Sequence, residues 1–368
     1  MAEKDQIELS IIVPVLNEEK SLKALFDNLF RQQRAAFEVI FCDGGSADES
    51  LNIIYNCAAG AFFPVKVVSG AAGRGRQMNA GIGQSRAETL LFLHVDSSFK
   101  NPLALRQGLD TLKAEWKRDG DFTAAGRFAL RFERGRDVFS TPYLFYETKA
   151  RLTRVGCIHG DQGFMMAQAF FSDLGGYRED LPILEDEALA DAVFARGKWV
   201  LLPAEIGTSA RRFQEEGLFE RQILNALIMN CRAIGWHPFF SESRGIYRQQ
   251  HECGRLELLP FFDKTAELLR EESWRRRFRL WRRTGAYINS NAWQVALLLD
   301  VRRWVKGGHL PPVKETPFLG AYDAGMRPWV ENAFGRGATT LLAWLWFHCY
   351  RFICRWRKFS KRSGKGYS

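Results

Sequence analysis

The 368-residue chain is predicted to be an α/β protein with a mostly parallel sheet and helices on both of its faces. Short apolar runs alternate four times with segments whose apolar residues recur at helical spacing, which is typical of a doubly wound sheet. Several runs stop abruptly at polar residues, as buried parallel strands do. Beyond about residue 250 the periodicity is helical and irregular, which predicts a largely helical carboxy-terminal extension.

The expected elements follow in order along the chain. The first strand, 9–15, carries Pro14 near its end, where no ladder donor is needed. A helix with one apolar face then opens at Glu18. Further strands are expected at 37–42, 65–69, 89–94, 124–132, 164–167 and 198–202. The intervening helices include one after the glycine-rich turn 70–75, and others at about 102–116, 138–152, 185–196 and 217–231.

Composition bounds the function. The net charge is +10, and the basic residues concentrate in 275–283 and beyond residue 350, which favours an anionic partner for the back of the chain. Seven cysteines, with no Cys-x-x-Cys pair, favour a reducing compartment and give no zinc site. The polar amino-terminus shows no signal-peptide pattern, so a cytoplasmic location is expected.

Acidic side chains follow several of the predicted strands. Glu18, Asp43 and Asp96 come after strands one, two and four, and His94 precedes Asp96 by two residues. The carboxyl ends of parallel strands meet at the edge where open α/β sheets bind ligands. Acids gathered there repel one another unless a cation or a hydrogen-bonding ligand joins them. The pattern fits a nucleotide-diphosphate site with a divalent metal, although Asp96 acting only as a helix cap is an equally good interpretation.

Six motifs occur in the order seen in family-2 glycosyltransferases, and residues 8–240 resemble that family. The subgroup that they resemble most is the arsenosugar-biosynthesis type. The motifs are Val13-Pro-Val-Leu-Asn-Glu-Glu19, Asp43-Gly-Gly-Ser-Ala-Asp48, Gly73-Arg-Gly-Arg-Gln-Met-Asn-Ala-Gly81, Phe92-Leu-His-Val-Asp96, Gly160-Asp-Gln-Gly163 and Leu184-Glu-Asp186.

The resemblance implies a GT-A fold and an inverting transfer from a nucleotide-diphosphate sugar to an unidentified acceptor hydroxyl. Asp186, beside Glu185, would be the general base, and Asp161 remains an alternative base. The other interpretation of Glu185-Asp186 is ordinary helix capping. Mn²⁺ or Mg²⁺ would be held by Asp96 and His94. The expected nucleotide-sugar-binding residues are Pro14, Asn17, Glu18, Asp43, Gly44, Arg74, Gln77, Asn79, Asp96, Arg211 and Arg212.

The chain departs from the family pattern in two places. The usual Asp-x-Asp reads His94-Val-Asp96, which removes one carboxylate from the expected metal site. The Gln-x-x-Arg-Trp motif of processive synthases is absent, and Arg211-Arg212 stands roughly in its place. These arginines are expected to hold the leaving diphosphate; a solvated pair is the alternative. Single additions are therefore favoured over polymerisation.

The back of the chain divides into two further predicted parts. Residues 1–245 are expected to be the glycosyltransferase domain, 246–336 a helical extension of unknown role, and 337–368 an amphipathic aromatic helix with a basic tail. The apolar run 338–350 is shorter than the roughly 20 residues of a bilayer span. Its tryptophans and the basic tail suit peripheral contact with the inner face of the cytoplasmic membrane. A lipid-linked acceptor is compatible with that contact.

Two other function classes remain open. A sugar-phosphate nucleotidyltransferase shares the sheet but needs a glycine-rich basic loop after strand one, where this chain has Glu18-Glu19. A non-catalytic basic protein that binds anionic lipid or nucleic acid fits the carboxy-terminal charge. The chain shows no nucleic-acid-binding motif, so nucleic acid is not the expected partner.

Overall fold

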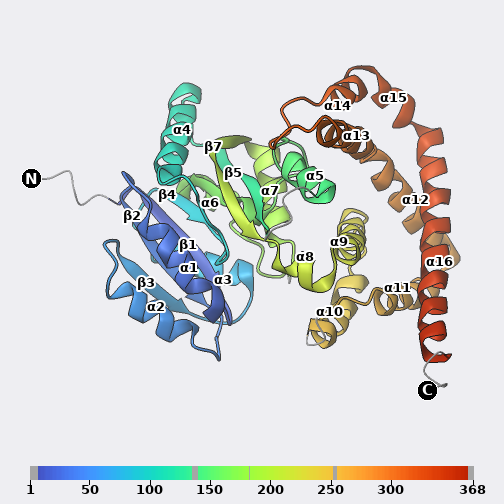
Figure 1. Cartoon of the computed structure of the whole chain (residues 1–368), viewed down its shortest axis with the longest axis horizontal. Coiled ribbons are helices and arrows are strands. Elements are labelled where there is room, and N and C mark those ends of the chain that lie inside the picture. The colour runs from blue at the N-terminus through green and yellow to red at the C-terminus, as the bar shows by residue number, and fades with distance from the viewer. Residues whose placement is uncertain (1–6, 135–139, 182, 252–254, 364–368) are drawn as a thin grey trace, which may run out of the picture. The chain divides into compact units, whose positions relative to one another are not determined.

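The computed structural model describes residues 7–134, 140–181, 183–251 and 255–363. The chain divides into two compact units, Met1–Ser209 and Ala210–Ser368 (Figure 1). The boundaries proposed from the sequence at 245/246 and 336/337 both fall inside helices of the second unit, α10 (Pro238–His251) and α16 (Ala333–Ser363). Whether these two boundaries separate parts of the chain with different functions stays a prediction.

The first unit is built on a seven-stranded sheet in the order β3-β2-β1-β4-β6-β5-β7. All neighbouring strands are parallel except β6, which runs antiparallel to both β4 and β5. The predicted mostly parallel sheet is therefore confirmed. The strands are β1 (Leu9–Val15), β2 (Phe37–Asp43), β3 (Val65–Ser69), β4 (Thr89–Phe92), β5 (Ala124–Glu133), β6 (Phe164–Ala167) and β7 (Lys198–Ser209).

Helices cover the two faces of this sheet. Phe26 stacks on Phe41 of β2 with ring centroids 5.1 Å apart, whereas the backbone of Gly81 lies against Cys42, the next residue of the same strand. Successive strand residues point to opposite faces, so the helices that carry Phe26 and Gly81 lie on opposite faces. The helices are α1 (Glu19–Phe30), α2 (Ser50–Ala58), α3 (Arg74–Ile82), α4 (Ala104–Asp119), α5 (Thr141–Lys149), the 3₁₀ turn η1 (Gly160–Gln162), α6 (Gln168–Asp173) and α7 (Glu185–Arg196).

The strand order reverses direction beside β1. From β1 the chain moves outward to β2 and β3 and then returns to place β4 on the other side of β1. The loops after β1 and β4 diverge at such a reversal, which leaves a crevice at the carboxyl ends of the strands. Asn17, Glu18, His94 and Asp96 follow these two strands, so the topology brings the predicted site residues to one edge.

Two strands differ in length from the sequence-based expectation. β4 ends at Phe92, so His94 lies in the loop after the strand rather than inside it. β7 continues to Ser209 instead of ending at 202, and a register shift falls opposite Arg127–Ala129 of β5. Pro203 lies within the shifted stretch and has no N–H for the ladder, so the strand pairs on either side of it. The predicted helix at 138–152 is α5; positions 138 and 139 lie outside the described residues.

The second unit is helical, which confirms the predicted helical extension. Two apolar clusters form its core, one around Phe261, Phe262 and Phe347 and the other around Trp236 and Phe239. The helices are α8 (Arg211–Glu216), α9 (Leu218–Ala233), α10, α11 (Leu259–Glu271), α12 (Trp274–Ser290), α13 (Trp293–Lys306), α14 (Pro317–Ala321), the π-helical turn η2 (Tyr322–Met326), α15 (Arg327–Val330) and α16.

The helices lack the character of membrane spans. Within the described ranges, each of them falls short of the combined length and apolar character that a bilayer crossing requires.

Close packing of α3 on the sheet gives the first prediction. A Cβ at Gly81 would lie 2.5 Å from Cys42 Sγ and 2.8 Å from Ile12 Cγ2, both on buried strands. We expect Gly81→Ala to destabilise the protein by about 1–3 kcal/mol, measured by urea unfolding. Gly83→Ala is the matched control, because its Cβ would meet only Ala80 O at 3.6 Å. Equal stability of the two variants would contradict this account of the packing.

Candidate functional site

The loop after β2 is built around Asp43. Its carboxylate lies at the end of the strand, is 2% exposed, and accepts the backbone N–H groups of Gly45 at 3.0 Å and Ser46 at 3.1 Å. The loop after β1 joins it, since Asn17 N donates to Ser46 Oγ and Asn17 Oδ1 accepts from Ala47 N. Asn17 has a φ of 56°, a left-handed value that asparagine tolerates better than most residues. Asp43 and Asn17 thus shape one paired loop.

Gln77 and Asn79 make specific protein contacts. Gln77 Nε2 donates to the carbonyls of Val15 and Cys42, at 2.8 and 2.7 Å, which ties α3 to the ends of β1 and β2. Gly44 fits against this amide, because a Cβ there would lie 3.0 Å from Gln77 Cδ. Asn79 bonds both backbone groups of Tyr177. These hydrogen bonds fix the positions of the glycine-rich turn and of the loop at Tyr177. Contact of Gly44, Gln77 or Asn79 with a nucleotide-sugar stays a prediction.

Asp186 lies at the start of α7, beside the 160 turn. Its Oδ2 accepts the N–H of Gly160 at 2.8 Å, and a Cβ at Gly160 would lie 3.2 Å from both Asp186 Oδ2 and His94 Nε2. The side chains of His94 and Asp186 therefore flank the same turn. Burial raises the pKa of Asp186, but His159, Arg74, the Gly160 N–H and His94 outweigh it, and the net shift is downward.

Arg74 is the cation of this cluster. Its guanidinium lies 3.3 Å from Glu185 Oε1, with 41% of the arginine side chain exposed and 3% of the glutamate. Burial lowers the pKa of Arg74, but the negative charges of Glu185 and Asp186 outweigh this effect, so the net shift is upward. Burial is also the main reason that the pKa of Glu185 is raised, with Arg74 opposing it. The pair joins the start of α3 to the start of α7.

Asp161 and His159 occupy the turn that carries Gly160. Burial raises the pKa of Asp161 to about 6, and its Oδ1 is buried without a hydrogen bond. His159 Nδ1 lies 2.6 Å from Oε1 of Glu187, which is 2% exposed. Burial lowers the pKa of His159, but the hydrogen bond with Glu187 outweighs it, so the net shift is upward. Glu187 was not predicted as a site residue from the sequence. The one signal that could have indicated it is its position directly after the Glu185-Asp186 pair.

Tyr177 is a second site residue that was not predicted from the sequence. It is 3% exposed, and its ring packs edge-on against Phe92 at 5.0 Å. Burial raises its pKa well above the usual value, with Asp186 and Glu185 adding to the effect. Asn79 holds the backbone of Tyr177 through two hydrogen bonds, and the charges of Asp186 and Glu185 reach its phenol.

Asp96, the predicted metal ligand, faces the end of β7. Its Oδ2 accepts from Thr208 Oγ1 at 3.3 Å and from Ser209 N at 3.4 Å. In the residues with described placement, no three histidine, cysteine, aspartate or glutamate side chains are grouped so as to hold a metal. A magnesium-type ion bound with phosphates typically takes one or two carboxylates and completes its shell with phosphate and water. Asp96 would supply one carboxylate to such a shared ion, and Asp161, whose pKa Asp96 raises, adds a second acid in its vicinity.

The remaining predicted residues lie in both units. Pro14 lies in β1, in register with Cys42 of β2, and Glu18 precedes α1, where its N–H donates to Ser50 Oγ at 2.8 Å. Arg211 and Arg212 open α8 in the second unit. Their contact with a donor diphosphate therefore stays a prediction.

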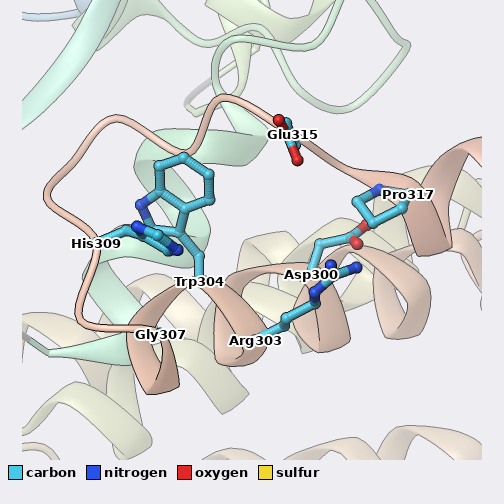
Figure 2. Close-up of a pocket in the computed structure, with 7 residues that line it drawn as sticks. All are labelled: Asp300, Arg303, Trp304, Gly307, His309, Glu315 and Pro317. Atoms are coloured by element: carbon cyan, nitrogen blue, oxygen red, sulfur yellow. The ribbon is translucent and has the colours of Figure 1, made fainter.

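A surface pocket in the second unit contains none of the predicted site residues. Figure 2 shows it between α13 and the segment leading to α14. Asp300, one of its two acidic residues, accepts the N–H groups of Phe318 and Leu319, each at 2.8 Å, and so caps α14. Trp304 donates to the carbonyl of Leu310 and packs against His309. These contacts explain the pocket as the folded turn between two helices.

Comparison with known proteins bears on the first unit. Residues 10–173 match the model of glycosyl transferase family 2. An uncharacterized glycosyltransferase of Synechocystis is 26% identical over 152 residues, which are 40% of this chain and 46% of that protein. The undecaprenyl-phosphate 4-deoxy-4-formamido-L-arabinose transferase of Pseudomonas fluorescens is 35% identical over 99 residues, 26% of this chain and 29% of that protein.

A solved structure matches over a larger share of the chain. The mannosyltransferase PcManGT of Pyrobaculum calidifontis, in complex with GDP-Man and Mn²⁺, gives a TM-score of 0.45 at 16% identity, covering 94% of this chain and 87% of that one. The chain spans less than half the length of the two curated relatives. The residues that match the family model include nearly all of β1, all of β2 to β6 and every motif up to Gly163, so this part of the first unit is similar to glycosyl transferase family 2.

Proposed function

We propose that the chain transfers a sugar from a nucleotide-diphosphate donor to an acceptor hydroxyl with inversion, and that Asp186 is the general base. The observation that carries this proposal is the environment of Asp186. It accepts a bond from Gly160 N, lies beside His94 and Arg74, and has a lowered pKa. A carboxylate held ionised at neutral pH can take the proton of a hydroxyl.

The proposed chemistry is a single displacement. The acceptor O–H proton passes to Asp186, the oxygen attacks the anomeric carbon, and the bond from that carbon to the diphosphate oxygen breaks. The electron pair leaves with the nucleoside diphosphate. The acceptor oxygen and the leaving group lie on opposite sides of the reacting carbon, which inverts its configuration. Asp186 then releases its proton to solvent.

Asp161, the alternative base, is less suited to this role. Its pKa is raised to about 6 by burial, so at a given pH a larger fraction of Asp161 than of Asp186 holds a proton. Proximity of the two carboxylates also favours a shared arrangement in which only one is readily ionised. We therefore infer that Asp161 shapes the acceptor side of the site, while Asp186 accepts the proton.

Donor binding is proposed for the paired loops after β1 and β2. Asp43 is the proposed contact for the nucleoside. Each of its oxygens still has acceptor capacity beyond the bonds from Gly45 and Ser46. Asn17, Glu18 and Pro14 would line the same side. Arg74, with 41% of its side chain exposed, offers positive charge to the diphosphate.

A divalent ion would be held by Asp96, and His94 remains its second predicted ligand. Bound there, Mn²⁺ or Mg²⁺ would neutralise negative charge on the leaving diphosphate. Thr208 and Ser209 orient the Asp96 carboxylate through their hydrogen bonds to Oδ2. Such support from neighbouring groups is a usual feature of metal-binding carboxylates.

The acceptor is proposed to be a hydroxyl of a lipid-linked molecule. The name of the Pseudomonas relative includes undecaprenyl phosphate, and that of a human relative, 32% identical over 119 residues, includes dolichyl phosphate. The net basic charge of this chain is compatible with an anionic lipid. A cytoplasmic location and membership of the arsenosugar-type subgroup remain parts of the same proposal.

Donor binding gives the second prediction. We expect the melting temperature to rise with one nucleotide class among UDP-, GDP-, dTDP- and CMP-sugars, more strongly with Mn²⁺ or Mg²⁺, because a ligand that binds only the folded state stabilises it. Asp96→Asn should remove the metal-dependent part of the shift, whereas Asp180→Asn, on an exposed loop, should keep it. A full metal-dependent shift in Asp96→Asn would exclude Asp96 as the ligand.

Catalysis gives the third prediction. Asp186→Asn should lower kcat by about 10²–10⁴-fold because the general base is removed. The donor-induced rise in melting temperature should remain, which separates loss of the base from loss of the fold. Asp161→Asn should retain measurably more activity than Asp186→Asn. The reverse ranking would assign the base to Asp161.

Stability against pH gives the fourth prediction. The pKa of Asp161 is about 6 in the folded protein, above its ordinary value, so the folded state holds a proton that the unfolded state has lost. The wild-type protein should therefore lose stability from this group as the pH rises from about 4 to about 6. Asp161→Asn should be more stable than wild type above pH 6, on the order of 2–3 kcal/mol, and the difference should shrink towards pH 4.

The measurement for Asp161 is urea unfolding at several pH values. Asp27→Asn is the matched control, because Asp27 is exposed on α1. Its stability relative to wild type should stay nearly constant over the same range. A difference between Asp161→Asn and wild type that does not depend on pH would rule out the raised pKa.

A further inference from the structure

The long helix α16 carries large apolar side chains on the side that does not pack on the protein. We call these residues the apolar stripe. Their exposed fractions range from 42% to 86%, although all seven are large and apolar. The residues of the apolar stripe are Phe334, Leu341, Leu342, Leu345, Phe352, Ile353 and Trp356.

The apolar stripe lies opposite the face by which α16 packs. At about 100° per residue its members fall within an arc of about 120°. Ala343, Phe347 and Tyr350 lie on the other side, where Phe347 stacks on Phe262 of α11 and contacts Trp281 of α12. α16 therefore already has a packed face, and the apolar stripe is a second one.

The apolar stripe is too long to be a set of scattered surface residues. Phe334 and Trp356 are 22 residues apart, which corresponds to about 33 Å of helix. Extended apolar surfaces of this kind mark sites for a protein partner or a membrane. The side chains include a tryptophan and two phenylalanines, which favour the boundary between lipid and water.

Charge identifies the occupant. The sequence of α16 contains no acidic residue. Arg357 and Arg355 lie just beyond the two edges of the apolar stripe, and Arg355 also pairs with Asp263 of α11 at 2.8 Å. The second unit has 28 lysines and arginines against 14 aspartates and glutamates, a formal net charge of +14. α12 adds six arginines without an acid. A second copy of the chain would meet this helix with the same positive charge, whereas an anionic bilayer would attract it.

We propose that the apolar stripe of α16 docks the second unit on an anionic lipid surface. The helix lies in the plane of the interface, with its apolar side chains among the acyl chains and its arginines at the phosphates. None of the helices in the described ranges is long and apolar enough to cross a bilayer, which agrees with a helix that lies on the surface. The inference goes beyond sugar transfer, because lipid binding needs no donor or acceptor.

The test uses the full chain and vesicle flotation. Wild type is mixed with phosphatidylcholine vesicles and with phosphatidylcholine–phosphatidylglycerol vesicles, at low and at high salt. We expect binding to the anionic vesicles that weakens at high salt. The double variant Phe352→Glu and Trp356→Glu should bind at least about 100-fold more weakly, because two exposed aromatic anchors are replaced by charge.

Tyr55→Glu is the matched control. Tyr55 lies on α2 of the first unit and is 58% exposed, so the change adds one of the two negative charges of the double variant at a similar exposed aromatic position. It should bind vesicles as wild type does. Unchanged melting temperatures of all variants would show that each remains folded.

Arg357→Gln separates the charge from the apolar contact. We expect about five-fold weaker binding to anionic vesicles and no change with neutral ones, as one arginine near an anionic surface contributes. The proposal is overturned if wild type ignores anionic vesicles at low salt. It is also overturned if the double variant binds as tightly as wild type.

Two other occupants have distinct outcomes. A second copy would give a concentration-dependent dimer that the double variant abolishes, without vesicle binding. A nucleic acid would give salt-sensitive binding to DNA or RNA that depends on the arginines and leaves vesicles unbound. Either result would replace the lipid surface. Neither would bear on sugar transfer, which is measured separately with donor and Asp186→Asn.

Discussion

Negative charge gathered at the carboxyl end of the sheet is the constraint on which the candidate site depends. The charge of Asp186 raises the pKa of both Asp161 and Glu185, and Asp96 also raises the pKa of Asp161. Like charges in a partly buried setting are costly unless cations accompany them. Arg74 and His159 lower the pKa of Asp186, and Glu187 in turn raises the pKa of His159. Since Arg74 opens α3 and Glu185 opens α7, the charge balance also fixes the start of one helix against another.

Amide side chains then hold the loops on which these charges sit. Gln77 binds carbonyls at the ends of two strands, and Asn79 binds both backbone groups of Tyr177. A buried backbone group without a hydrogen-bond partner costs free energy, and such groups occur where strands and helices end. The two amide side chains supply hydrogen bonds to backbone groups at these ends. Residues that match a family motif, such as Gln77 and Asn79, can therefore stabilise the loops of a site through protein contacts.

Much of the fold was predictable because buried parallel strands leave a strong local signal. The first four strands, α1 and α3 follow from apolar runs and helical spacing in the sequence alone. The sequence did not predict the antiparallel direction of β6 or the extension of β7 past Pro203, because strand direction and register depend on neighbours distant in sequence. The positions of Asp43 and Asp96 after strands, and of Asp186 at a helix start, were predictable, whereas the role of Asp186 came from the family resemblance and stays a prediction. The His159–Glu187 contact joins two segments that are separate in sequence and has no local pattern.

The two units of the chain carry formal net charges of opposite sign. The first unit has 24 lysines and arginines against 28 aspartates and glutamates, a formal net charge of −4, while the second carries +14. The whole-chain value of +10 therefore does not describe the domain that carries the candidate site. An acidic unit does not attract an anion through its net charge, so in the proposed function that attraction would come from local cations such as Arg74 and a divalent ion. The basic excess belongs instead to helices such as α12 and α16 of the second unit, so the proposed donor binding and the proposed surface attachment depend on different charges.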